Sequence, residues 1–297
     1  MFKSGFIAII GRPNSGKSTL LNSLFKQKLA IISKKPQTTR NAIRGILTSD
    51  DYQMIFIDTP GIHKPHHKLG QNMNKTAYAN AKGVDLIYLI VDATLPFGSG
   101  DEYVLEKLPE FNEPTFLVIN KIDKISKVQL IQLIEDYQHR YNFKEIVPIS
   151  ALQFENLDKL LELTLENLHE GVKYYPAKQV VEYPEQFIIS EIIREKVLDN
   201  TEQEIPHSVA VVIEQIKKRR DTLHINSMIL VERDSQKGII IGKKGDMIKR
   251  IGQAAREELE LILGNKIYLE LFVRVEKDWR NKQNKLQQLG YVPIIEE

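Results

Sequence analysis

The chain has 297 residues, of which 42% are hydrophobic and 27% are charged, a composition typical of globular proteins. It contains no cysteine, which excludes disulfide bonds, thiolate catalysis and cysteine-based zinc sites, and no apolar run approaches the ~18 residues that cross a bilayer. The formal net charge is only +2, so the chain as a whole carries no charge signal for a nucleic-acid partner.

The first part of the chain, residues 1–170, alternates short apolar runs with amphipathic segments of helix length. Strands are predicted at 5–10, 44–47, 53–57, 85–91, 115–119 and 145–148. Helices are predicted between them, for example at 17–25, 128–141 and 157–168. Strands separated by helices indicate an α/β domain with a mainly parallel sheet and helices on both faces. Ligands of such sheets bind at the carboxyl ends of the strands.

Residues 171–184 contain one glycine and two prolines without clear periodicity, which predicts a linker. The pattern changes after it. Predicted elements follow in the order helix 185–197, strands 208–216 and 222–231, helices 238–242 and 246–263, strand 266–275 and a polar helix 278–289. This α-β-β-α-α-β order indicates a second, smaller α+β domain over residues 185–297.

A glycine-rich loop follows the first predicted strand and opens the first predicted helix. Its residues match the phosphate-binding pattern G-x-x-x-x-G-K-S/T: Gly11, Arg12, Pro13, Asn14, Ser15, Gly16, Lys17 and Ser18. Glycines let backbone N–H groups turn inward around a polyphosphate, and the helix adds the positive end of its dipole. We expect Lys17 to meet the β- and γ-phosphates, Ser18 to ligate Mg²⁺, and Thr19 to complete the phosphate-binding set.

A second motif, D-x-x-G, comes at the end of the third predicted strand: Asp58, Thr59, Pro60 and Gly61. A carboxylate at Asp58 can hold Mg²⁺, and the N–H of Gly61 can contact the γ-phosphate. Between the two motifs lies a Q-T-T-R segment, in a loop that we expect to order only with a triphosphate. We favour Thr39 as a magnesium ligand, and Thr38 stays open because adjacent threonines cannot be separated from sequence.

A third motif, N-K-x-D, follows the strand predicted at 115–119: Asn120, Lys121 and Asp123. Guanine presents two adjacent donors, which one carboxylate at Asp123 can accept together, whereas adenine presents an acceptor at N1. Asn120 is expected to bind the other edge of the base, and the stem of Lys121 to cover it. An S-A-L segment follows the next strand: Ser150, Ala151 and Leu152. The N–H of Ala151 is expected near guanine O6, so the motifs together predict GTP and GDP as ligands.

Many GTPases place a glutamine directly after D-x-x-G to orient the attacking water. Here that position is Ile62, which cannot orient water, so we expect slow intrinsic hydrolysis. The predicted catalytic set is Lys17, Thr39, Gly61 and Asn14. For Asn14 we hypothesise that its amide oxygen binds K⁺ beside the phosphates, and the competing interpretation is a hydrogen bond that only braces the loop.

Residues 239–248 match the pattern I-G-x-x-G-x-x-I/V/L of a type II KH domain, a module that binds single-stranded RNA. Residues 217–250 carry ten basic and four acidic side chains, although 178–297 as a whole has 20 of each. The alternatives are a solvated charged face and a plain helix–helix turn. The predicted RNA contacts are Ile241, Gly242, Lys243, Lys244, Gly245, Lys217, Lys218, Arg219, Arg220, Lys249 and Arg250.

The combination of these motifs resembles the bacterial Era GTPases, within the TrmE-Era-EngA-like P-loop GTPases. The resemblance rests on G-R-P-N-S-G-K-S, Q-T-T-R, D-T-P-G, N-K-x-D and S-A-L, followed by a G-K-K-G loop and a tail with V-E-K-D-W-R-N. It implies a Mg²⁺-dependent GTPase that binds the 3′ end of 16S rRNA and assists maturation of the small ribosomal subunit. It also implies that the nucleotide state gates RNA binding, and that part of the protein associates peripherally with the inner face of the cell membrane.

Two other functions stay open at this point. One is a GTPase that acts in tRNA modification or in membrane and cell-cycle signalling. The other is an RNA adaptor that binds GTP for structure without significant catalysis. The lack of cysteine and of a signal-peptide pattern leads us to expect a cytoplasmic protein, and a monomer is the default expectation.

Overall fold

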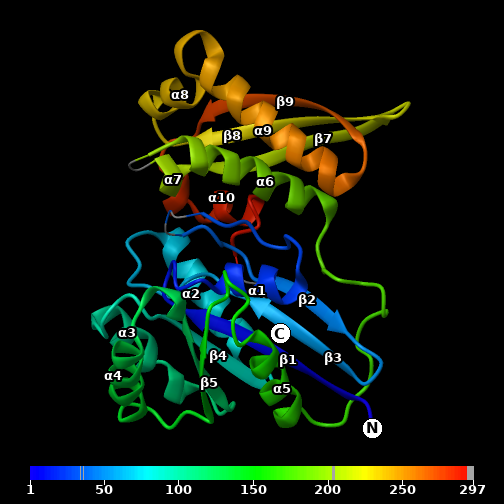
Figure 1. The fold of residues 1–297 in the computed structure, drawn as a ribbon. Coiled ribbons are helices and arrows are strands. Elements are labelled where there is room, and N and C mark those ends of the chain that lie inside the picture. The colour runs from blue at the N-terminus through cyan, green and yellow to red at the C-terminus, as the bar shows by residue number, and fades with distance from the viewer. Residues whose placement is uncertain (34, 36, 203–204, 293–297) are drawn as a thin grey trace. The chain divides into compact units, whose positions relative to one another are not determined.

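The computed structural model describes residues 1–33, 35, 37–202 and 205–292, and the chain forms two compact units (Figure 1). The first unit holds Met1–Ile32, Thr39–Glu182 and residues 291–292. The second unit holds Ser33–Thr38 and Tyr183–Gly290.

The first unit is built on a six-stranded sheet with the order β2-β3-β1-β4-β5-β6. Its strands are β1 (Lys3–Gly11), β2 (Ile43–Thr48), β3 (Tyr52–Asp58), β4 (Leu86–Asp92), β5 (Thr115–Asn120) and β6 (Glu145–Ile149). Only β2 runs antiparallel to its neighbour β3, and the other pairs are parallel. Parallel strands need crossover connections, which the intervening helices supply.

Helices cover both faces of this sheet (Figure 1). They are α1 (Lys17–Phe25), α2 (Lys68–Ala81), α3 (Ser99–Leu105), α4 (Lys127–Gln138) and α5 (Leu157–Asn167). Alternate residues of each strand serve opposite faces. On β1, Ala8 and Ile10 share a hydrophobic core with α2, α3 and α4. On the other face, Tyr88 hydrogen-bonds Thr164 of α5 and stacks on Phe116.

The second unit contains a three-stranded sheet with the order β7-β8-β9, in which β7 and β8 are antiparallel and β8 and β9 parallel. Its elements are α6 (Glu185–Asn200), α7 (Ile205–Ser208), β7 (Ala210–Arg219), β8 (Thr222–Val231), α8 (Asp234–Ile241), α9 (Asp246–Leu263), β9 (Lys266–Val275) and α10 (Gln283–Gln288). Helices α6 and α9 lie side by side on one face of the sheet and share its core (Figure 1). The predicted α/β and α+β architectures are therefore confirmed.

Two helix predictions in the second unit are corrected. Helix α8 begins at Asp234, four residues earlier than the predicted start at 238, because the side chain of Gln236 accepts hydrogen bonds from the backbone N–H groups of Glu232 and Arg233. The single polar helix predicted at 278–289 is instead a short turn at Trp279–Asn281 followed by α10, with extended backbone at Lys282 between them.

The side chain of Trp279 explains why the predicted C-terminal helix is interrupted. Trp279 is fully buried, and its Nε1 donates a hydrogen bond of 2.9 Å to the carbonyl oxygen of Ser208. A buried indole needs such an acceptor, so its orientation fixes the chain there. Within the described part of the chain, no helix combines the length and apolar character needed to cross a membrane.

Candidate nucleotide site and nucleic-acid interface

The loop between β1 and α1 curls around the ammonium group of Lys17. Its Nζ donates to the carbonyl oxygens of Arg12, at 2.8 Å, and Gly11, at 3.2 Å. The backbone takes positive φ at Gly11 (146°), Asn14 (63°) and Gly16 (100°). A side chain at Gly11 would stand 2.3 Å from the carbonyl oxygen of Ile90, so only glycine fits there. The sequence motif thus folds into a tight loop with a cation at its centre.

Two buried ionisable groups lie at this loop. Desolvation lowers the pKa of Lys17 to about 8, although the charge of Asp58 opposes the shift. Burial likewise raises the pKa of Asp58 to about 6, against the opposing effects of Lys17, Ser18 and Thr39. Both shifts have burial as their largest cause, because burial removes water from the charged forms. An anion beside Lys17 and a cation beside Asp58 would each favour the charged form.

Three oxygen-bearing side chains gather next to Lys17. The Oγ of Ser18 lies 2.6 Å from Oδ2 of Asp58 and 2.8 Å from Oγ1 of Thr39. The second carboxylate oxygen of Asp58 is buried without a hydrogen-bond partner. Hydroxyl and carboxylate oxygens are the ligands that Mg²⁺ prefers, so this set fits the metal that the motifs imply. The hydroxyl of Thr38 instead donates to the carbonyl oxygen of Lys35 at 2.7 Å, an arrangement that favours Thr39 as the ligand.

The D-x-x-G segment is held against the phosphate loop by backbone contacts. Thr59 Oγ1 donates to the carbonyl oxygen of Ile9 at 2.8 Å, and the N–H of Ile62 donates to that of Gly11 at 3.0 Å. A Cβ on Gly61 would come within 2.7 Å of backbone atoms of Pro13, so the two loops meet at a glycine. The side chain of Ile62 is only 1% exposed and packs in the core, away from any water.

Asn120 joins the two ends of the site through a single side-chain amide. Its Nδ2 donates to the carbonyl oxygen of Ser15 at 3.0 Å. Its Oδ1 accepts from the N–H groups of Lys121, at 2.8 Å, and Ala151, at 3.0 Å. The N–H of Ala151 is therefore turned toward Asn120, and its predicted contact with guanine O6 stays a prediction.

The carboxylate of Asp123 is oriented by Ser150, whose hydroxyl donates to Oδ1 at 2.6 Å. The same hydroxyl accepts from the N–H of Gln153 at 3.2 Å, which fixes its direction. This leaves Oδ2 of Asp123 outside that hydrogen bond. Leu152, in contrast, is 62% exposed. The structure thus brings together Asn120, Lys121, Asp123, Ser150 and Ala151, whereas Leu152 of the same loop is exposed.

Two acidic residues at the site were missed by the sequence motifs. Asp92, at the end of β4, forms an ion pair with Lys121, whose Nζ also donates to the carbonyl oxygen of Asn14 at 2.9 Å. Burial disfavours ionisation of Asp92, but hydrogen bonds from Lys121 and Thr94 together with the charge of Lys121 outweigh it, so the pKa of Asp92 is lowered. Asp101 of α3 accepts from Arg12 at 2.7 Å, so this side chain of the phosphate loop is turned toward α3. The position of Asp92 at a strand end was the one available signal.

In the second unit, the G-K-K-G loop makes a tight turn between α8 and α9. Gly242 (φ 74°) and Gly245 (φ 83°) both have left-handed φ values, and Lys244 between them has φ 56°. A Cβ on Gly242 would come within 2.8 Å of the backbone nitrogen of Met247. The side chains of Lys243 and Lys244 are exposed, and Ile241 is half-buried at the end of α8. The loop therefore presents two lysine side chains next to glycines that have no side chain, an arrangement that lets the sugar–phosphate backbone of RNA approach closely.

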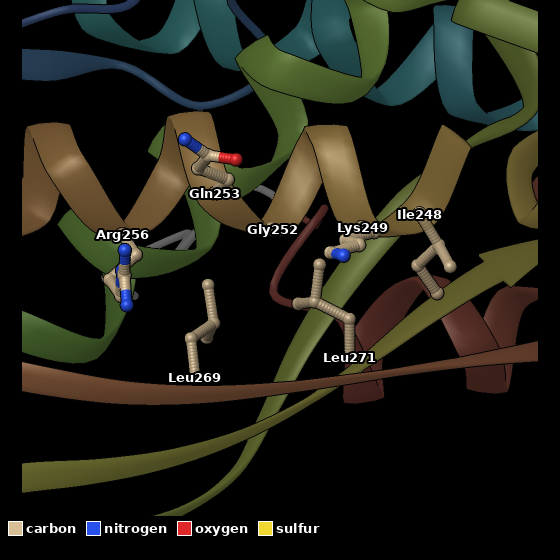
Figure 2. A pocket seen from close by; sticks show the side chains of 7 residues that line it. All are labelled: Ile248, Lys249, Gly252, Gln253, Arg256, Leu269 and Leu271. Atoms are coloured by element: carbon tan, nitrogen blue, oxygen red, sulfur yellow. The ribbon is translucent and has the colours of Figure 1, made fainter. Parts of the chain in front are cut away.

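A groove of about 380 Å³ runs between α9 and β9, beside this loop (Figure 2). Leu269 and Leu271 rise from β9 toward α9, and Lys249 borders the groove on the helix side. Gly252 lies in the middle of the helix, where even a Cβ would stand 3.3 Å from Leu271. The remaining lining residues are Ile248, Gln253 and Arg256. Apart from Lys249 these residues were not predicted, although a glycine inside an amphipathic helix marks a place where something approaches closely.

The predicted basic residues divide into two groups. Lys249 and Arg250 follow the loop on α9, with Arg250 in contact with the sulfur of Met247 at 3.3 Å. Residues 217–220 occupy the end of β7 and its turn into β8, a hairpin tip paired with the start of β9. The loop is at the first residue of α9 and the hairpin tip lies toward its last, so about 27 Å of helix separate them. The structure therefore does not bring this group to the G-K-K-G loop.

Comparison with known proteins agrees with this geometry. Residues 6–121 match the family model of the 50S ribosome-binding GTPases, and residues 204–280 match that of the KH domain. A variant of Aquifex aeolicus Era bound to GDP and aluminium fluoride is 42% identical with a TM-score of 0.93, and the match covers 98% of this chain and 100% of that chain. Era in complex with MgGDPNP and nucleotides 1506–1542 of 16S ribosomal RNA is 41% identical with a TM-score of 0.94, over the same shares.

The fold and its two sites define a P-loop GTPase joined to a KH domain. More narrowly, the chain belongs to the Era family of GTPases, since the likeness extends over nearly all of it. The family resemblance predicted from the motifs is thereby confirmed.

Proposed function

We propose that the protein is a GTP-hydrolysing switch that binds the 3′ end of 16S rRNA through its KH domain and assists maturation of the small (30S) ribosomal subunit. The observation that carries this proposal is the presence of a full set of guanine-nucleotide motifs and a G-K-K-G loop with its groove on one chain. Relatives that match its whole length were solved with GDP, with MgGDPNP and with 16S rRNA.

The nucleotide site divides its tasks among three loops. The residues from Gly11 to Thr19 hold the phosphates, with Lys17 as the fixed cation, and Ser18, Thr39 and Asp58 hold the magnesium. Bound Mg²⁺ neutralises the charge that develops on the phosphate oxygens. Asp123 selects guanine over adenine. Asn120 joins the loop that binds the base to the loop that binds the phosphates. Because Ile62 is buried, a group other than its side chain has to position the attacking water.

The RNA site joins phosphate contacts and base contacts. Lys243 and Lys244 meet the sugar–phosphate chain at the G-K-K-G loop, with Lys249 and Arg250 beside it. The groove over Leu269 and Leu271 takes the unstacked bases. The lysines supply affinity that falls with salt, and the groove supplies the choice of sequence.

We propose further that nucleotide state gates RNA binding. The gate requires different contacts in the two nucleotide states, and the loop that contains Thr39 is the element that a γ-phosphate can order. The test is the affinity for a labelled RNA of the 16S 3′ end, measured with MgGDPNP and with MgGDP. Different affinities are expected. Equal affinities would show that the nucleotide does not control this site, while the RNA-binding proposal would stand on the affinity itself.

Potassium stimulation of hydrolysis is a separate proposal. Asn14 has positive φ in the phosphate loop, and its carbonyl oxygen already accepts from Lys121, so its amide is held beside the nucleotide site. A monovalent cation bound there would stabilise the charge of the transition state. Faster GTP turnover in KCl than in NaCl is expected for the natural protein, and Asn14→Ala should abolish the difference. Equal turnover in the two salts would end the idea.

We place the protein in the cytoplasm as a monomer, with part of it peripherally bound to the inner face of the cell membrane. For its functional division we propose a GTPase domain at 1–170, a linker at 171–184 and a KH domain with its C-terminal helix at 185–297. Fractionation of cells and light scattering of the purified protein test the location and the oligomeric state. Removal of residues 185–297 should leave GDP binding intact.

A further inference from the structure

The second unit has a sheet face that the groove does not use. Leu269 and Leu271 of β9 point toward α9 and the core (Figure 2). Because side chains alternate along a strand, Tyr268 and Phe272 lie on the opposite face of the sheet. These two aromatic residues are 50% and 49% exposed. Phe154 and Tyr174 are exposed to a similar degree, but Tyr268 and Phe272 form a pair on one strand and one sheet face, which makes that face a candidate binding surface.

The strand register shows which side chains accompany the aromatic pair. Tyr268 pairs with His224 of β8, and their rings lie 5.0 Å apart, while His224 in turn pairs with Lys217 of β7. Phe272 pairs with Met228 of β8. Across the three strands, the rings of Tyr268 and His224 and the side chain of Lys217 therefore follow one another on this face. Phe272 lies four positions after Tyr268 on β9, which corresponds to a distance of about 13 Å along the strand.

The charge on this face is mainly positive. Four exposed basic side chains share it, whereas the acidic side chains of the strands outside the core are Glu270 and the exposed Glu214 at the bulge of β7. The basic residues are Lys217, Arg219, Lys266 and Arg274. The core of a protein–protein interface is depleted of charged residues, whereas flat aromatic rings among cations are how proteins hold single-stranded nucleic acid.

We propose that the exposed face of the β7-β8-β9 sheet is a second site for single-stranded RNA, where bases stack on Tyr268 and Phe272 and phosphates meet the surrounding basic side chains. This rests on the proposed RNA-binding function but concerns the face opposite the groove. Lys217 and Arg219 lie too far from the G-K-K-G loop to contact RNA bound there. On this face, in contrast, they would contact the phosphates of the second RNA strand. Stacking is tolerant of sequence, so this face holds a strand without choosing its bases.

The test separates the two faces by variants. Lys243→Glu with Lys244→Glu impairs the loop through two exposed side chains, so folding is not at risk. The probe is a fluorescent oligouridine of about 12 nucleotides, within the range of known single-strand sites. We expect the loop variant to keep weak, salt-dependent binding of this probe. Adding Tyr268→Ala and Phe272→Ala should weaken that remaining binding about tenfold or more.

Matched variants decide whether stacking is the cause. Leu261→Ala with Ile262→Ala removes two other exposed apolar side chains and should leave binding unchanged. Tyr268→Trp in place of Tyr268→Ala should keep the affinity of the natural residue, since indole stacks as well. The proposal is overturned if the loop variant binds no oligouridine, or if removal of the aromatic pair changes nothing, as a protein-binding face would predict. If the loop variant binds the 16S 3′-end RNA as tightly as the natural protein, the proposal that the loop and its groove are the RNA site is wrong instead.

Discussion

At the scale of single residues, the nucleotide site depends on side chains that each perform one geometric task. Ser150 does not meet the nucleotide in any step proposed above, but its hydroxyl orients the carboxylate of Asp123 at 2.6 Å. A bidentate contact to guanine requires such a fixed direction, because two donors must be met at once. We therefore expect the choice of base to depend on this carboxylate and on the hydroxyl that orients it.

Replacing Asp123 by asparagine should change the preferred base. The amide offers a donor where the carboxylate offered an acceptor, and xanthine carries a carbonyl where guanine carries its exocyclic amine. We expect GDP affinity to fall at least about 100-fold and XDP affinity to exceed it. Competition binding with the two diphosphates measures this. Asp136→Asn, on an exposed position of α4, is the matched control, and unchanged GDP affinity of Asp123→Asn would contradict the assignment.

Residue by residue, the motifs predicted the site well where function demands a fixed spacing along the chain. Lys17, Ser18 and Asp58 meet as expected. The partners that were missed, Asp92 and Asp101, lie far from the motifs in sequence and have no spacing that distinguishes them from other surface acids. Their roles come from the tertiary fold, which a local pattern does not contain.

At the scale of elements, a glycine inside a long helix has a clear purpose. Gly252 costs α9 helical stability, roughly 0.5–1 kcal/mol relative to alanine, but its missing side chain keeps the groove open over Leu271. The other face of the helix compensates for that cost, because Ile251, Ala255 and Leu259 are fully buried. The spacing of these three apolar residues is why the bounds of α9 could be predicted from sequence.

Filling this position should block the RNA site. Gly252→Leu places a bulky side chain in the groove, and we expect affinity for the 16S 3′-end RNA to fall about tenfold or more, as when a stacked base is lost. GDP affinity should not change. Gly238→Leu on α8 is the control, since no atom lies within 4 Å of its Cβ. Normal RNA binding by Gly252→Leu would mean that the groove is not the site.

Prediction of the other elements varied with their composition. Strands β8 and β9 and helix α1 have the predicted bounds. Helix α2 was not singled out, because Asn72, Asn74 and Thr76 are buried on its inner face and obscure its apolar period. Their burial is compensated by hydrogen bonds such as that from Asn74 to the carbonyl oxygen of His63, which sequence periodicity does not register.

At the scale of the whole molecule, the two units have separate cores, so ligands of one unit should stabilise that unit selectively. We expect two unfolding transitions in calorimetry. MgGDP at about 100 times its Kd should add about 2.7 kcal/mol to one of them and raise its Tm by about 5–10 °C. MgADP at the same concentration is the control. A single transition that shifts as a whole would contradict independent units.

The loop before Thr39 connects the nucleotide site to the second unit. Arg194 of α6 is fully buried, pairs with Glu191, and donates a hydrogen bond to the backbone oxygen of Thr38. Thr38 belongs to the second unit and Thr39 to the first, so the boundary falls on one peptide bond. The sequence left the two threonines unresolved because their roles depend on partners distant in the chain, Ser18 for Thr39 and Arg194 for the backbone of Thr38.

Arg194→Gln should uncouple RNA affinity from nucleotide state. We expect GDP and GDPNP to bind as before, while the ratio of RNA affinities in the two states falls toward one. Lys196→Gln, which removes an ion pair on the same helix, serves as the control. Because a buried arginine also stabilises the fold, Glu191→Gln is a milder second variant: it keeps Arg194 but weakens the ion pair that orients it. A ratio equal to that of the natural protein in both variants would contradict the link.

The split between two neighbouring threonines has a mechanical consequence. Consecutive Cα atoms across a trans peptide are about 3.8 Å apart, and this length does not stretch. If loss of the γ-phosphate displaces Thr39, we expect the hydrogen bond between Arg194 and the backbone oxygen of Thr38 to break or to shift with it. Such a displacement would act on Thr38 through the covalent backbone alone and would need no side-chain contact between the two threonines.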